Sequence, residues 1–153
     1  MSNTYVLDAE TVHYSWDNGI TPRLTIDAGD TVVFSTIDAG DGFYNQDSTS
    51  EDIEKAGPFN GHPLTGPVYI RDATPGDVLV IKIVAMEIAS IFGWTAMKPG
   101  PGLLPANEIP GAYLQIWDLS DGTHARMRQR KDIAVPVASF PGVMGNALAE
   151  AGS

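Results

Sequence analysis

The residues of this chain that could do chemistry are its carboxylates and its three histidines. Cysteine is absent, which excludes disulfides, thiolate metal ligands and a cysteine nucleophile. Carboxylates and imidazoles can hold a divalent metal, activate a water molecule and move protons, so hydrolysis is open to such a set without a serine triad. The candidates are Asp38, Asp41, Asp47, His13, His62, His124 and Glu150.

Two of the carboxylates, Asp38 and Glu150, differ in how strongly their positions in the sequence suggest a function. Asp38 follows residues 31–37, a run of β-branched and aromatic residues, at the point where a loop begins. A carboxylate at a strand end is well placed for a site, and it is also a common turn residue. Glu150 lies in the last few residues, where an exposed glutamate is the ordinary interpretation. The residues alone leave both roles open.

The three histidines indicate structure more than catalysis. His13 lies in the alternating segment 11–16, and a half-buried structural histidine is the favoured interpretation. His62 begins a loop stiffened by Pro63 and Pro67, in which Gly66 can supply a backbone angle that other residues cannot. Such a loop would hold Thr65 in place as one wall of a binding site. His124 shares a predicted hairpin with three alternate arginines, and we interpret that cluster as a solvated strand face rather than a phosphate site.

The elements that must position these residues are predicted to be short strands joined by turns. The predicted strands are residues 11–16, 23–26, 31–37, 68–71, 78–87, 113–119, 123–128 and 132–136. Of these, 78–87 is the longest. A short helix is predicted after Thr49, and the proline- and glycine-rich residues 89–108 are predicted to form a long functional loop. The pattern predicts a mainly β fold, a sandwich or barrel-like domain with long loops and at most short helices, spanning residues 1–153.

Composition limits the class of partner. The formal net charge of the 153-residue chain is −10, which argues against nucleic acid and anionic membranes because both reward lysine and arginine. The first ten residues have no basic start or apolar run typical of a signal peptide, and no stretch approaches the ~18 apolar residues of a membrane span. A cytoplasmic protein is expected.

An ordered set of short motifs resembles the acetamidase/formamidase family of amide hydrolases. In chain order these motifs are residues 13–18, the turn 29–32, Asp38 with Asn45 and Gln46, the segment 63–67, the segment 75–79, Gly93-Trp94-Thr95, and residues 141–145 close to Glu150. No single motif is specific, whereas their order and spacing are. The resemblance implies hydrolysis of formamide, acetamide or similar small aliphatic amides to a carboxylate and ammonia by a metal-activated water.

The resemblance also implies roles for particular residues. It implies that Asp38 is a metal ligand, that Asn45 or Gln46 lines the substrate pocket and that Glu150 is the general base, with zinc, calcium or both as the metal. Their loops lead us to expect Thr65 and Trp94 as further walls of the same pocket. Trp94 is equally consistent with a core residue. The segment before Glu150 departs from the family pattern at Asn146 and Leu148, and these changes bear on where Glu150 points.

The resemblance covers the whole chain but only about the first half of the family's length, and two later histidine-containing segments have no counterpart here. We therefore expect an amidase half that needs a complementary C-terminal half or a homo-oligomer. Exposed apolar residues at Leu103, Leu104, Val143, Met144 and Leu148 would then be covered by a second copy. The alternative is a non-catalytic β-sandwich module for binding or assembly. A cupredoxin-like copper site is excluded because it requires a cysteine thiolate.

Overall fold

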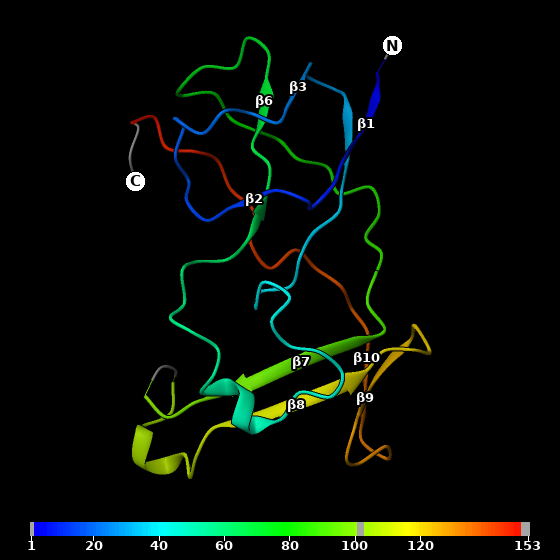
Figure 1. Ribbon diagram of the computed structural model, residues 1–153. Coiled ribbons are helices and arrows are strands. Elements are labelled where there is room, and N and C mark those ends of the chain that lie inside the picture. Colours follow the sequence, from blue (N-terminus) through cyan, green and yellow to red (C-terminus); the bar gives the residue numbers. More distant parts are fainter. Residues whose placement is uncertain (1, 101–102, 151–153) are drawn as a thin grey trace. The chain divides into compact units, whose positions relative to one another are not determined.

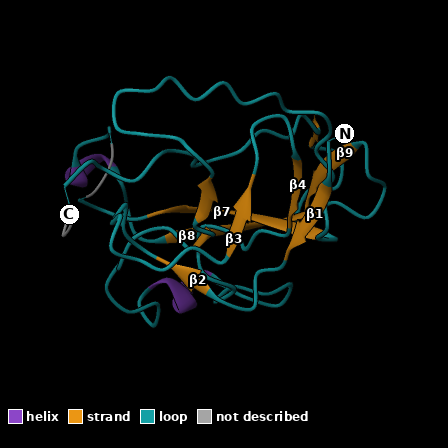
Figure 2. Cartoon of the chain, turned by 90° about the horizontal axis from the view of Figure 1, so that it is seen from above, coloured by secondary structure: helices purple, strands orange, loops and turns teal. Residues whose placement is uncertain are grey.

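The computed structural model describes residues 2–100 and 103–150 (Figure 1). Within those ranges the chain forms ten short strands, β1 to β10, and two 3-10 helices, η1 and η2, without any α-helix. The prediction of a mainly β fold with at most short helices is therefore confirmed. Loops and turns connect these elements over much of the chain (Figure 2). Across the described ranges, neither helix has the length or the apolar character that crossing a membrane requires.

The chain folds into two compact units. The first contains the described parts of Met1–Gly42, Asn60–Lys82 and Pro141–Ser153. The second contains Phe43–Phe59 and the described part of Ile83–Phe140. The expectation of a single domain over residues 1–153 stays a prediction.

The first unit holds three two-stranded sheets. Its strands are β1 (Thr4–Leu7), β2 (Val12–His13), β3 (Leu24–Ile26), β4 (Thr31–Phe34), β5 (Leu64–Thr65) and β6 (Val68–Ile70). β1 pairs with β4 and β3 pairs with β6 in parallel, whereas β2 and β5 are antiparallel. Valine and threonine are the commonest residues in these strands, and such β-branched side chains fit a pleated, half-buried surface. The carboxyl end of β4 leads directly toward the loop that contains Asp38.

The first unit is fastened by one half-buried arginine. The guanidinium of Arg23 donates to the main-chain oxygens of Asp8 and Thr11, both at 2.8 Å, and to the carboxylate of Asp8 at 2.6 Å. Asp8 and Thr11 lie between β1 and β2, so these bonds fix the connection between the two strands. The segment 11–18, which contains the candidate residue His13, begins at the end of this connection. The same ion pair lowers the pKa of Asp8.

Two turns of the first unit have the same construction. In each, the aspartate of a Gly-Asp pair accepts a main-chain N–H from the residue three positions earlier, Asp30 from Asp27 at 3.0 Å and Asp77 from Thr74 at 2.8 Å. Asp30 also accepts the N–H of Asn3 at 2.7 Å, and these bonds hold the pKa of Asp30 below its usual range. Each turn is therefore stabilised by contacts within four residues of chain.

The second unit is built on one antiparallel sheet of four strands. They are β7 (Phe92–Met97), β8 (Tyr113–Asp118), β9 (His124–Met127) and β10 (Ala134–Pro136), in the spatial order β10-β9-β8-β7. β7 pairs with β8 over its full length, from Phe92 opposite Asp118 to Met97 opposite Tyr113. β7 is thus one edge of this sheet. The helices are η1 (Ser50–Ile53) and η2 (Ala106–Glu108).

The core of the second unit lies between η1 and the sheet. It consists of the buried side chains of Tyr44, Ile53, Leu114 and Ile116, against which Phe92 and Trp94 pack. The main-chain N–H of Leu114 donates to the hydroxyl of Ser50 at 3.0 Å, which attaches η1 to β8. The short helix predicted after Thr49 is confirmed as this 3-10 turn, and the main-chain N–H of Thr49 donates to the carboxylate of Asp52 at 2.8 Å.

Three sequence predictions about elements are wrong. The strand predicted at 78–87 does not form, because no other described segment hydrogen bonds to that backbone. The predicted loop 89–108 instead contains β7, whose six-residue pairing with β8 outweighs the weak strand preference of Gly93. The strand predicted at 11–16 is reduced to Val12–His13, where β5 supplies the partner.

Candidate active site

The first unit contains an open, mainly apolar hollow of about 560 Å³. The residues that line it are Tyr14, Ser15, Trp16, Met144, Gly145, Asn146 and Leu148. The hollow forms because the C-terminal segment lies along residues 14–18. The N–H of Leu148 donates to the main-chain oxygen of Trp16 at 3.1 Å, and the Asn18 amide donates to the main-chain oxygen of Ala149 at 2.8 Å.

Close packing between Gly145 and Trp16 sets the shape of this hollow. A Cβ atom on Gly145 would lie 3.3 Å from the indole of Trp16, so the ring occupies the space that any larger side chain would need. The approach of Trp16 therefore explains the second glycine of the Gly-Val-Met-Gly segment, Gly145. This close packing brings the segment that ends at Glu150 onto the wall formed by residues 14–16.

The loop of Asp38 is attached to the same wall. The Tyr14 hydroxyl donates to Oδ2 of Asp41 at 2.7 Å, and this hydrogen bond to a carboxylate raises the pKa of Tyr14. Three residues earlier, the carboxylate of Asp38 accepts the N–H groups of Gly40 at 2.8 Å and Gly42 at 3.1 Å. Asp38 is exposed and its orientation is fixed by its own turn.

Asp38, the predicted metal ligand, and Glu150, the predicted general base, therefore belong to segments that hydrogen bond to residues 14–16. Glu150 is exposed and follows Leu148 by two positions. The described residues do not supply a full set of metal ligands. They contain no group of three or more histidine, aspartate or glutamate side chains able to hold a metal ion. A zinc site usually takes three protein ligands. The predicted zinc or calcium thus does not fit the described residues by themselves.

Thr65 lies in the first unit as part of β5. Its hydroxyl donates to the main-chain oxygen of Ser35 at 2.8 Å, which attaches the stiff loop to the chain just beyond β4. His13, opposite Leu64 in the β2–β5 pair, is half-buried, and its Nδ1 lies 2.8 Å from the main-chain oxygen of Ser15. His62 is exposed. The role of Thr65 in substrate binding stays a prediction.

The other three predicted site residues lie in the second unit. The side-chain oxygen of Asn45 accepts the N–H of Asp47 at 2.8 Å, so this amide caps its own turn. Arg128 donates to the main-chain oxygens of Gln46 and Ser48, which holds the same turn in place. The Trp94 ring packs on Tyr44 with 4.6 Å between ring centroids, next to the core. The predicted site residues are therefore divided equally between the two units.

Sequence reasoning missed Tyr14, Trp16 and Arg128. The first two lie in a segment that already contributed to the family resemblance, and their alternation with Ser15 was the available signal. Arg128 gave none, because its partners are main-chain oxygens 80 and 82 residues away in the sequence. Only a folded chain brings them together.

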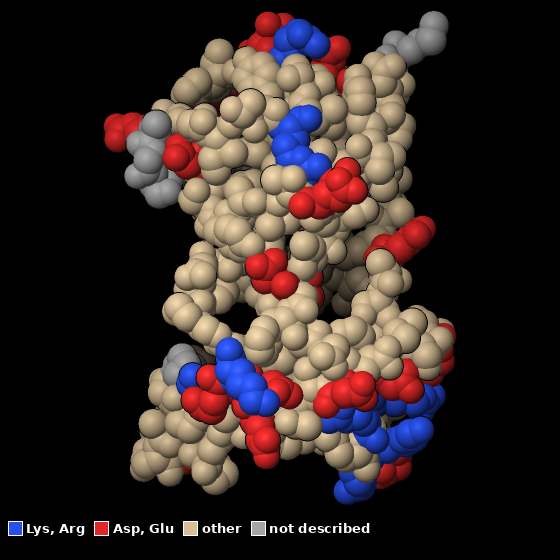
Figure 3. All heavy atoms as spheres, viewed as in Figure 1, with Lys and Arg blue, Asp and Glu red and all other residues tan. Residues whose placement is uncertain are grey.

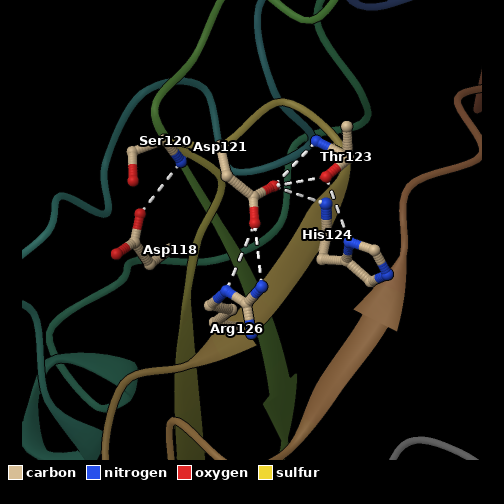
Figure 4. A network of polar contacts seen from close by, with 6 residues as sticks. All are labelled: Asp118, Ser120, Asp121, Thr123, His124 and Arg126. Carbon is tan, nitrogen blue, oxygen red and sulfur yellow. Dashed lines mark hydrogen bonds and ion pairs between the residues drawn. The ribbon is translucent and has the colours of Figure 1, made fainter.

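The densest polar network near a histidine is structural. Asp121, in the turn between β8 and β9, accepts the N–H groups of Thr123 at 2.8 Å and His124 at 2.6 Å, and its other oxygen accepts from Arg126 (Figure 4). These bonds hold the pKa of Asp121 far below its usual range. Arg130 is paired with Asp132 in the same way. The network holds a hairpin turn in place, and the interpretation of the arginine-rich segment as a solvated strand face rather than a phosphate site stays a prediction.

Comparison with known proteins decides the family. Residues 2–151 match the model of the Acetamidase/Formamidase family. The chain belongs to this family. It is 30% identical over 141 residues to a putative formamidase of Schizosaccharomyces pombe, covering 89% of this chain and 34% of that protein. It is 25% identical over 149 residues to an acetamidase of Mycolicibacterium smegmatis, covering 88% of this chain and 36% of that protein.

A solved structure agrees with this assignment. The crystal structure of a predicted acetamidase/formamidase from Thermoanaerobacter tengcongensis matches with a TM-score of 0.73 and 27% identity, over 90% of this chain and 43% of that one. The chain therefore spans about a third of the length of these curated relatives and less than half of the solved one.

Proposed function

We propose that this chain takes part in the hydrolysis of small aliphatic amides, such as formamide or acetamide, to a carboxylate and ammonia, together with further polypeptide of the kind that its relatives contain. Family membership supports the reaction class. The observation that carries the assignment to a site is the hollow beside Tyr14 and Trp16, since the segments of both Asp38 and Glu150 are hydrogen bonded to its wall.

The residues of the hollow suit a small amide in part. Trp16, Met144 and Leu148 supply an apolar wall, and the Tyr14 oxygen retains a lone pair that can accept an amide N–H while its own proton is held by Asp41. Glu150 is proposed as the base that takes a proton from the attacking water. A volume of about 560 Å³ far exceeds a molecule of formamide or acetamide, so another wall is needed to exclude water.

A divalent metal, zinc or calcium, remains part of the proposal only with ligands from outside the described residues. Asp38 can contribute one carboxylate oxygen if its turn releases it from the N–H groups of Gly40 and Gly42. The cytoplasmic location is likewise proposed from the sequence alone.

A second function, binding without catalysis, is favoured by one observation. Asn146 and Leu148, where the chain departs from the family pattern, both line the hollow. If their side chains fill the position of the substrate, the unit would serve as a binding or assembly module. An assembled protein that neither binds nor hydrolyses formamide or acetamide would select this alternative.

The test is ammonia release from formamide and acetamide, with zinc or calcium supplied, by the chain co-expressed with the remaining polypeptide of the Schizosaccharomyces pombe relative. Replacing Glu150 with Gln is expected to lower kcat by about 10²- to 10⁴-fold, the usual effect of losing an acid–base group. Asp38→Ala is expected to lower it through the loss of a metal ligand. Glu10→Ala is the matched control, since this exposed carboxylate belongs to the first unit and is none of the candidate residues. Equal activity of all three variants would contradict the proposed site.

A further inference from the structure

The segment Ile83–Ile91 of the second unit has the composition of a strand without forming one. Five of its nine side chains are large, apolar and exposed, namely Ile83, Val84, Met86, Ile88 and Ile91, and Glu87 is its only charged residue. Among the described residues, nothing pairs with the backbone N–H and C=O groups of residues 83–90. A strand makes no hydrogen bonds within itself, so this backbone depends on a partner that the described chain does not supply.

One end of the segment is already held in the geometry of a sheet. It continues directly into β7, and the N–H of Leu119 donates to the main-chain oxygen of Ile91 at 2.9 Å, which extends the β7–β8 pairing by one residue (Figure 1). Extension of this edge strand toward Ile83 therefore requires no change in the sheet. It requires only a second backbone alongside the segment.

The surroundings offer room for apolar side chains. A hollow of about 440 Å³ lies at the middle of the segment, bordered by Met86, Glu87 and Ile88 and by Gly122, Val137 and Ser139. Much of the molecular face in Figure 3 carries neither acidic nor basic side chains. Edge strands of soluble proteins are usually protected by lysine, proline or a cover, and in this segment Glu87 alone provides such protection.

Charge argues against a second copy as the partner. Each copy carries a formal net charge of −10, and like charges of this size keep proteins apart. The relatives suggest another partner, because each contains further chain beyond the third that this chain matches.

We propose that Ile83–Ile91 is a docking strand for the polypeptide that corresponds to the unmatched part of these relatives. A strand of that polypeptide pairs with the backbone of the segment, and its alternate apolar residues cover Val84, Met86 and Ile88. This inference uses family membership and concerns assembly, so it holds whether or not the assembled protein hydrolyses amides.

The experiment is co-expression of this chain with the part of the Schizosaccharomyces pombe relative that lies outside the matched 141 residues. Hydrogen–deuterium exchange is then compared between the purified complex and the chain alone. We expect exchange of the amides of residues 83–90 to slow by at least about tenfold, equivalent to 1.4 kcal/mol. Failure to form a complex, or a complex without protection of these amides, would overturn the inference.

Two variants of the segment and one control sharpen the result. Val84→Lys places a charge on the docking face, and Met86→Pro removes an N–H on the side of the strand away from β8, so each is expected to weaken the complex by at least about tenfold. Val6→Lys is the matched control, because Val6 and Val84 are each 74% exposed, and it should change the dissociation constant by less than about twofold. Circular dichroism of each isolated variant verifies folding. Concentration-dependent dimers of the chain alone with protected residues 83–90 would show that a second copy is the partner and contradict the proposal.

Discussion

At the residue scale, two glycines pack closely against the wall formed by residues 14–16. Gly61 has a φ of 104°, in the left-handed region, and a Cβ atom there would lie 2.9 Å from the main-chain oxygen of Tyr14. Gly145 approaches Trp16 almost as closely. These two glycines bring the loop of residues 61–65 and the C-terminal segment onto the wall formed by residues 14–16.

Replacing Gly61 with Ala should therefore destabilise the protein by about 1–3 kcal/mol, the usual cost of a strained backbone position. Both the positive φ and the contact with Tyr14 contribute to this cost. Gly57→Ala is the control, because the space around Gly57 is open and its φ is not in the left-handed region. Urea unfolding measures the difference, and equal stabilities of the two variants would contradict the contact described here.

The Asp121 network leads to a prediction about pH. Because its folded pKa lies below the ordinary value of 3.8, Asp121 stabilises the fold fully above that pH, and the contribution is lost as the pH falls through the folded pKa. Asp121→Asn should unfold at a lower temperature than the unchanged protein at pH 7. The gap should narrow as the pH falls below 3.8. Thermal unfolding over a pH series measures it, and a constant gap at all pH values would refute the role of the carboxylate.

At the element scale, the second unit is stabilised by the contact between η1 and the four-stranded sheet. Leu114 of β8 is the most deeply buried large side chain of that contact, with 2% of its surface exposed. Tyr44, Ile53 and Ile116 surround it. The sheet and helix therefore depend on one small cluster.

Leu114→Ala should lower the free energy of unfolding by about 2–5 kcal/mol, through lost burial and the cavity left behind. Leu104→Ala removes the same atoms from a side chain that is 52% exposed, and its effect should stay within about 0.5 kcal/mol. Chemical denaturation followed by tryptophan fluorescence reports on this unit because Trp94 packs against the cluster. A Leu104 effect as large as that of Leu114 would contradict the assigned core.

The two Gly-Asp turns show how much of the elements could be predicted from sequence. Both turns form, since each is stabilised by an aspartate that bonds within four residues. After Asp30 the predicted strand also forms, because β1 pairs with it as β4. After Asp77 the equally apolar run forms no strand, because its partner is absent from the described chain. Local patterns thus specify turns and strand preference, whereas a strand itself requires a partner that no local pattern reveals.

At the scale of the whole molecule, the candidate site was likewise predictable from the sequence only in part. The sequence motifs identified the family, and the family match confirms that assignment. The roles of the two carboxylate segments stay predictions. Sequence motifs did not reveal that Tyr14 and Trp16 form the wall to which both segments attach, nor that Asn45 is held in its own turn. The wall depends on hydrogen bonds between residues far apart in the sequence, whereas the turn of Asn45 combines a local bond to Asp47 with distant bonds from Arg128. The chain spans about a third of the relatives' length, and its described residues contain no group of three metal ligands. We therefore propose that it carries only part of a catalytic set.

The most direct test of this account is ammonia release from formamide by the 153-residue chain, measured alone and after co-expression with the remaining polypeptide of a relative, with zinc or calcium present in both cases. The account predicts no activity from the folded chain alone and clear activity from the assembled protein. Full activity of the chain alone would contradict it, because the catalytic set would then be complete without added residues.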